Sequence, residues 1–84
     1  MGEDPAHNEP LGACREALEG GAWQRARSCF ERALARDESP EALEGLSWAA
    51  WWLDDAAAVL EARERAYRLY KKRGNDAGAA RMAT

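Results

Sequence analysis

Apolar residues recur along most of this chain at intervals of three and four positions, which is the spacing of one face of an α-helix. Between these stripes lie short breaks rich in glycine, aspartate, serine and proline, the residues that favour turns. The pattern predicts helical segments over 10–19, 22–36, 40–53 and 56–73, followed by a short segment over 76–82. Residues 1–8 have no such periodicity, so we expect a flexible tail there and one folded domain over 9–84.

The strongest helix start is Ser39-Pro40-Glu41. A serine side chain can accept a hydrogen bond from a free N–H of the first turn, and proline at the first helical position loses no hydrogen bond. The following helix has two apolar faces. Leucines and alanine occupy one face, while the other carries Trp48, Trp51 and Trp52. A helix that is apolar on two sides is either buried on both or presents one side to a partner.

Composition supports an all-α fold, because Ala, Leu, Glu and Arg dominate while β-branched residues are almost absent. A spacing within the second predicted helix, Ala26-x3-Phe30-x2-Ala33, returns 33 residues later as Val59-x3-Arg63-x2-Ala66. Small residues on either side of a large one let neighbouring helices approach closely. Self-similarity at this period indicates stacked antiparallel helix-turn-helix repeats, here two repeats and part of a third.

This pattern resembles the tetratricopeptide repeat, a 34-residue helix pair that carries a similar alanine, aromatic and alanine spacing. Ala26, Phe30 and Ala33 match that spacing well, whereas Val59 and Arg63 depart from it in the second copy. Residues 39–55, together with 63–70, resemble more narrowly the N-terminal repeats of actinobacterial LuxR-type transcriptional regulators. The resemblance covers residues 10–84. It implies a protein-binding module, but no DNA-binding helix-turn-helix of that family is recognisable here.

Net charge and apolar content limit the kinds of partner that we expect. The net charge of −3 offers no electrostatic footprint for nucleic acid, so we expect no direct nucleic acid binding. We expect no membrane partner, because no apolar run approaches about 20 residues. Cys14 and Cys29 without a secretory signal indicate a reducing, cytoplasmic location. The simplest interpretation makes both of them small core residues, and a disulfide between them stays open.

Residues suited to catalysis or metal binding are scarce. His7 is the only histidine, and no Cys-x2-Cys pair or phosphate-binding glycine loop is present. We therefore expect no enzyme, no metal and no cofactor. The basic run from Arg68 to Arg73 is interpreted as a solvated helix end, because cations there complement the helix dipole.

The candidate partner-binding residues are Trp48, Trp51 and Trp52, with Arg15 and Glu44 as rim charges. In tetratricopeptide arrays the first helix of each repeat lines the concave groove, and these residues fall on such positions. We expect a partner peptide or helix, or a homodimer formed through the same face. One alternative is that single tryptophans pack inside the domain. Another is that the chain is a small-ligand-sensing module of a transcriptional regulator.

Overall fold

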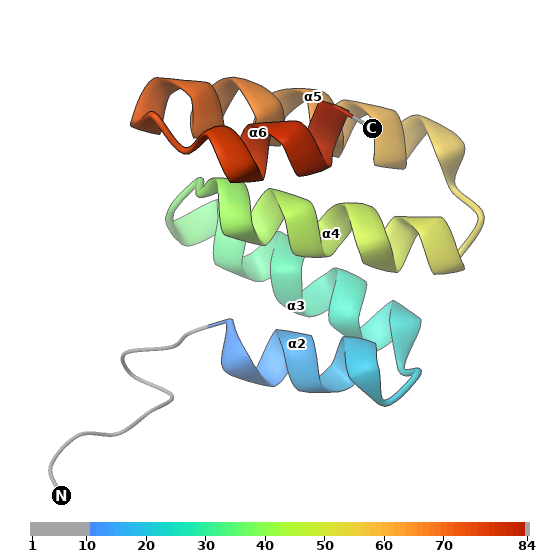
Figure 1. Cartoon of the computed structure of the whole chain (residues 1–84). Coiled ribbons are helices and arrows are strands. Elements are labelled where there is room, and N and C mark those ends of the chain that lie inside the picture. The colour runs from blue at the N-terminus through green and yellow to red at the C-terminus, as the bar shows by residue number, and fades with distance from the viewer. Residues whose placement is uncertain (1–10, 84) are drawn as a thin grey trace, which may run out of the picture.

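Five α-helices follow one another in a computed structural model that describes residues 11–83 (Figure 1). The helices are α2 (Gly12–Glu19), α3 (Trp23–Arg36), α4 (Pro40–Trp52), α5 (Ala56–Arg73) and α6 (Asp76–Ala83). The predicted all-α class is confirmed, and the predicted bounds agree to within about two residues wherever both ends are described. The predicted tail over 1–8 lies outside the described residues.

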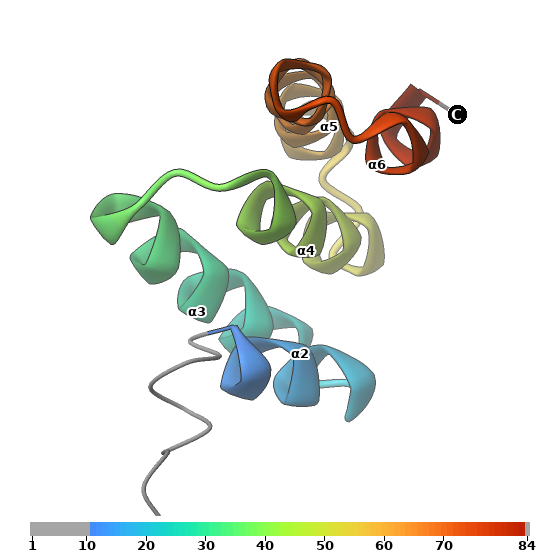
Figure 2. The same ribbon diagram turned by 60° about the vertical axis from the view of Figure 1, so that its left-hand side comes forward.

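The helices stack in chain order. Each packs against the next, and α2 also touches α4. The first helix and the last therefore lie at opposite ends of the stack, as both ribbon views show (Figures 1 and 2). Connections of two to three residues make successive helices antiparallel neighbours.

Local sequence sets where the helices begin. The Ser39 hydroxyl accepts a hydrogen bond from the Ala42 N–H at 3.2 Å, which confirms the predicted cap of α4. Asp55 caps α5 in the same way through the Ala58 N–H.

Two aromatic rings anchor two adjoining core clusters. Phe30 is fully buried among small residues of α2, α3 and α4. Tyr70, 1% exposed, is buried among residues of α4, α5 and α6. Each ring lies against a glycine of the following helix: a Cβ atom added at Gly45 would lie 2.2 Å from the Phe30 ring, and one at Gly78 would lie 2.6 Å from the Tyr70 ring. Glycine allows each ring to reach the backbone of the neighbouring helix.

The spacing of 33 residues seen in the sequence also relates parts of the backbone. Helices α3 and α5 begin at Trp23 and Ala56, and the turns before them contain Gly21 and Asp54, both with positive φ. The Gly21 N–H donates to the Leu18 carbonyl, and the Asp54 N–H donates to the Trp51 carbonyl. Two consecutive helix pairs thus share the same turn geometry. The resemblance to tetratricopeptide repeats stays a prediction.

The apolar positions of α5 predict an inward face made of Ala56, Val59, Leu60, Ala66, Tyr67 and Tyr70, and the observed inward face is narrower. Val59, Ala66 and Tyr70 are buried as expected, but Ala56 and Tyr67 are exposed and Leu60 is 70% exposed. The buried stripe is completed by Ala62, so the inward positions follow intervals of three and four residues. Leu60 and Tyr67 each lie one position beyond a buried residue, which turns them about 100° away from the core.

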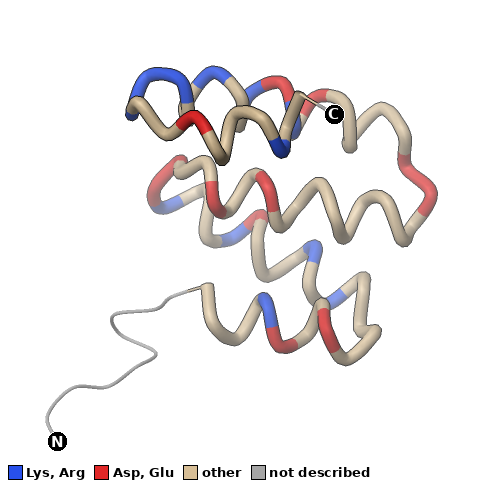
Figure 3. Tube along the Cα trace, in the orientation of Figure 1, with Lys and Arg blue, Asp and Glu red and all other residues tan. Residues whose placement is uncertain are grey.

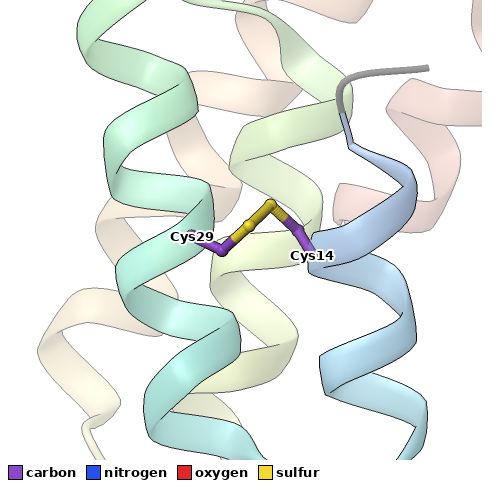
Figure 4. Close-up of a disulfide and its surroundings, with 2 residues drawn as sticks. All are labelled: Cys14 and Cys29. Carbon is purple, nitrogen blue, oxygen red and sulfur yellow. A yellow bond between two sulfur atoms is a disulfide. The ribbon is translucent and has the colours of Figure 1, made fainter. Parts of the chain in front are cut away.

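The two cysteines are joined, which corrects their interpretation as separate core thiols. A disulfide links Cys14 of α2 to Cys29 of α3, with a Cα–Cα distance of 5.3 Å (Figure 4). The reason is geometric, because the two helices run antiparallel and both residues face the interface between them. Cys14 is buried in the same cluster as Phe30.

Candidate interaction surface

Three tryptophans of α4 form an exposed aromatic surface, which we call the tryptophan face. The exposed fractions of Trp48, Trp51 and Trp52 are 41%, 57% and 55%. Leu43 and Ala50 of the same helix are fully buried. Helical geometry separates the two sets, because positions 48, 51 and 52 share one side while 43 and 50 lie on the other. None of the three side chains is part of the core, which removes the alternative that they pack inside the domain.

A fourth tryptophan extends this surface. The ring of Trp23, at the start of α3, stacks on the ring of Trp52 with a centroid distance of 4.8 Å and an interplanar angle of 10°. The apolar spacing Trp23, Ala26, Phe30, Ala33 and Leu34 predicts that Trp23 belongs to the inward stripe of α3, but its side chain is only half-buried. The stack holds Trp52 against α3 and so limits its rotamers.

Beside the tryptophan face lies a groove of about 390 Å³. Arg15 and Glu19 of α2 line one side, and Glu44 and Trp48 of α4 line the other. The structure therefore brings together three of the five predicted site residues, Arg15, Glu44 and Trp48. Trp51 and Trp52 do not line the groove, although they share the exposed side of α4 with Trp48.

A hydrogen-bonded network forms part of the wall of this groove. The Tyr70 hydroxyl donates to Oε1 of Glu44 at 2.6 Å. Arg81 of α6 donates to both oxygens of the same carboxylate, from Nε at 2.8 Å and from Nη2 at 3.0 Å. The guanidinium of Arg81 also lies 5.6 Å from the centre of the Tyr70 ring. Glu44 is thus the centre of an ion pair between α4 and α6, rather than a free rim charge.

Sequence reasoning did not find Tyr70 and Arg81 as site residues. They lie 26 and 37 positions after Glu44, and only the stacking of α5 and α6 on α4 brings them to it. No local motif marks such a contact. The glycine at position 78 was the available signal, because its lack of a side chain lets the Tyr70 ring lie beneath α6.

The network shifts the pKa values of Tyr70 and Glu44. Burial, followed by the hydrogen bond to the Glu44 carboxylate, raises the pKa of Tyr70 from 10.0 to about 12. Burial alone would raise the pKa of Glu44, but the hydrogen bonds from Arg81 and Tyr70 outweigh it, so that pKa is lowered. The neutral phenol and the ionised carboxylate are therefore the favoured forms in the folded protein.

This arrangement predicts a loss of stability in alkali. In the unfolded chain Tyr70 ionises near pH 10, whereas in the folded chain it stays protonated to about pH 12. Its contribution is therefore fully present below pH 10 and is lost as the pH rises towards 12. We expect the free energy of unfolding of the wild type to fall relative to that of Tyr70→Phe over this interval. Denaturant unfolding of both proteins across the alkaline range measures this, and parallel curves would contradict it.

A second arginine contacts the tryptophan face. The guanidinium of Arg63, from α5, lies 5.3 Å from the centre of the Trp48 ring, a cation–π geometry. Its Nε is buried and has no hydrogen-bond partner among residues 11–83. Arg63 lies 33 residues after Phe30, so it is the counterpart in the second helix pair of the aromatic residue in the first. Its contact with the Trp48 ring holds the Arg63 side chain in place.

Within residues 11–83, no cluster of three or more His, Cys, Asp or Glu side chains is placed to hold a metal ion, and His7 lies outside this range. No helix in the same range combines the length and apolarity that crossing a membrane requires. The surface that stands out chemically is the aromatic one with its adjoining charged groove.

Comparison with known proteins adds no family to this description: no protein-family model, no curated protein and no solved structure matches the chain.

Proposed function

We propose that this protein is a non-catalytic protein–protein interaction module that binds through the tryptophan face. The observation that carries the proposal is the exposure of Trp48, Trp51 and Trp52 on one side of a single helix. Exposed apolar side chains scattered singly are ordinary, but contiguous ones mark interaction sites. Tryptophan is also the residue type that most often dominates binding energy in interfaces.

The helical arrangement supports the same proposal. Two helix pairs with equivalent turns at Gly21 and Asp54 are what tetratricopeptide-like repeats would produce, and such arrays bind partners along their first helices. In that arrangement α2 and α4 are first helices, and they carry Arg15, Glu44 and the tryptophan face. The proposal includes no catalysis, no cofactor, and no direct contact with nucleic acid or membrane.

The occupant of the tryptophan face is either another protein or a second copy of this chain, and the mass in solution separates them. We would measure it by light scattering after size exclusion, over a range of concentrations. A dimer that dissociates on dilution would assign the face to self-association. A monomer at all concentrations would leave the face available for a different protein.

Trp51→Ala and Trp52→Ala are expected to weaken association by at least about tenfold, because both side chains are more than half exposed. Trp51→Ala should change the free energy of unfolding little. Trp52→Ala also removes the stack on Trp23, so we expect it to lower that free energy by about 0.5–1.5 kcal/mol without unfolding the domain. Affinity is measured by titration and stability by denaturant unfolding. Leu60→Ala is the matched control, because it removes an exposed apolar side chain of α5 without touching the tryptophan face. If the tryptophan variants unfold instead, the side chains act in folding and the proposal fails.

A second candidate function is that of a ligand-sensing module of a transcriptional regulator. It is favoured by the groove beside Trp48, whose volume of about 390 Å³ falls within the usual range for small-molecule sites. Glu44, Tyr70 and Arg81 would supply its polar contacts. Native mass spectrometry of the purified protein tests this directly. A co-purifying small molecule that is lost in a Trp48→Ala variant would favour sensing, and a bare protein mass would count against it.

A further inference from the structure

The structure divides the basic run at the end of α5 between different surroundings. Arg73 forms an ion pair with Glu41 of α4. Arg68 and Lys72, together with Arg65 of the preceding turn, line a groove of about 400 Å³ beside the connection between α3 and α4. We call it the α5 groove. Figure 3 shows blue positions gathered along this half of α5. Part of the run therefore lines a concave surface, in addition to complementing the helix dipole.

The three cations of the α5 groove form a row. Arg65, Arg68 and Lys72 follow one another at intervals of three and four residues, so they lie on one face of α5. With a rise of 1.5 Å per residue, the row extends over about 10 Å of helix. Leu69 also lines the groove, while it packs against the core cluster around Tyr70. The groove thus offers positive charges at successive turns with an apolar side chain beside them.

Two of these cations have no anionic partner. Within residues 11–83, the exposed side chains of Arg68 and Lys72 are in no ion pair or hydrogen bond. Arg65 pairs with Glu38, the carboxylate that lines the groove. Both side chains of that pair are exposed, by 41% and 46%, so the pair is weak and can be exchanged. Three cations against one carboxylate leave the lining with a net charge of +2.

We propose that the α5 groove binds an acidic helix of another protein, whose carboxylates at successive turns pair with the row of cations while an apolar side chain rests on Leu69. A helix repeats its own side chains at intervals of three and four residues, so its carboxylates can match the spacing of the row. The chain itself shows the chemistry that the groove accepts, because a carboxylate already pairs with Arg65 there. Complementary charge of this kind fixes register and partner choice in an interface.

Phosphate groups suit this row less well. A single phosphate is held by donors that converge on it, whereas these cations stand about one turn apart. A long nucleic acid strand needs a longer positive surface. Glu61, four residues before Arg65 on the same face of α5, ends the row with a negative charge. The short row therefore favours a short acidic segment.

The α5 groove is separate from the tryptophan face. Arg63, which contacts the Trp48 ring, comes two positions before Arg65 and so lies about 160° away around the helix. The residues that line the α5 groove are all different from those that line the groove beside Trp48. The inference therefore adds a second interaction surface and does not depend on the proposed function of the first.

The test uses two labelled helical peptides of the same composition and net charge. In the one-face peptide, glutamates recur at intervals of three and four residues beside a leucine. In the scrambled peptide, the same residues are spread around the helix. Binding to the full chain is followed by fluorescence anisotropy. We expect the one-face peptide to bind at least about fivefold more tightly than the scrambled peptide, and its affinity to fall with added salt.

Variants of the free cations locate the binding site. Arg68→Gln and Lys72→Gln should each weaken the one-face peptide by about threefold to fivefold, the effect of losing an exposed ion pair, and the double variant by about tenfold. Both side chains are exposed, so these variants should fold as the wild type does. Lys71→Gln is the matched control, because it removes the same charge from the same run at a position that does not line the groove. It should change the affinity by less than about twofold.

Removing the groove's own carboxylate should act in the opposite direction. Glu38→Gln releases Arg65, and we expect it to tighten the one-face peptide by about threefold. Glu31→Gln is the matched control. It makes the same change of net charge and breaks an exposed ion pair with Arg27 of α3, away from the groove. It should leave the affinity unchanged.

The other outcomes overturn the inference. If both peptides bind equally and Lys71→Gln and Glu31→Gln act as strongly as the groove variants, the attraction is unspecific. An oligonucleotide of equal charge that binds more tightly and is weakened in Arg68→Gln would assign the groove to phosphate. Self-association that is lost in Lys72→Gln would assign it to a second copy. If Trp51→Ala also weakens the peptide, the two surfaces are one site. If neither peptide binds, the groove is not an acidic-helix site, and the proposed function of the tryptophan face still stands.

Discussion

Replacing Phe30 by alanine is expected to lower the free energy of unfolding by about 3–5 kcal/mol. The ring is fully buried, and it fills the space between α2, α3 and α4 against the backbone of Gly45. Its neighbours Ala26, Ala42 and Ala49 are too small to close the cavity. A domain of this size has a total stability of about 4–13 kcal/mol, so this one change removes a large part of it. Denaturant unfolding followed by circular dichroism measures the loss.

Gly45→Ala provides the matching test of that contact. A methyl group there would meet the Phe30 ring at 2.2 Å, so we expect the single variant to lose about 1–3 kcal/mol. When Phe30 is already alanine the clash is absent, and alanine at position 45 also favours the helix. The double variant should therefore be no less stable than Phe30→Ala alone. Additive losses would mean that the ring does not lie on Gly45.

Much of the fold follows from local features. Ser39-Pro40-Glu41 encodes the start of α4 through side-chain chemistry that acts within one turn, and the structure places the helix there. The exposed side of α4 could also be predicted from the sequence, because a helix with leucine on one face leaves its tryptophans on the other. These inferences hold because they depend on helical geometry within one segment.

Features that depend on how helices pack could not be predicted from the sequence. The apolar spacing of α5 predicts that Leu60 and Tyr67 face inward, yet the approach of α4 and α6 to α5 leaves only the stripe through Ala62 and Ala66 covered. The network of Glu44, Tyr70 and Arg81 likewise requires three helices to be in place. Within a candidate site, the aromatic anchors can therefore be predicted from periodicity, whereas the partners of its charged residues cannot.

Breaking the bond between Cys14 and Cys29 is expected to lower the free energy of unfolding by about 3 kcal/mol. The two residues are separated by 15 positions, and closing a loop of that length restricts the unfolded chain by about this amount. Unfolding with and without a phosphine reductant measures the effect. Mass spectrometry after alkylation in denaturant should find no free thiol in the untreated protein.

The second helix pair suggests a variant that removes the bond without disturbing the packing. The positions 33 residues after Cys14 and Cys29 hold Ser47 and Ala62, both buried. The Ser47 hydroxyl donates to the Glu44 carbonyl at 2.7 Å, so a serine can be satisfied at such a position. Cys14→Ser/Cys29→Ala should match the reduced wild type in stability and should not respond to reductant. If it is instead as stable as the untreated wild type, the bond contributes nothing.

The effect of reduction on stability also bears on the cellular compartment in which the protein acts. Disulfides persist in oxidising compartments and are rare in the cytoplasm, which is the location that the sequence predicts. In a reducing cytoplasm the chain would lack about 3 kcal/mol of a total near 4–13 kcal/mol, and α2 would be held to α3 by packing alone. Because α2 carries Arg15 and Glu19 of the groove, its loosening would also weaken binding at the tryptophan face. Partner affinity that falls on reduction in the wild type, but not in Cys14→Ser/Cys29→Ala, would tie the bond to the interaction surface.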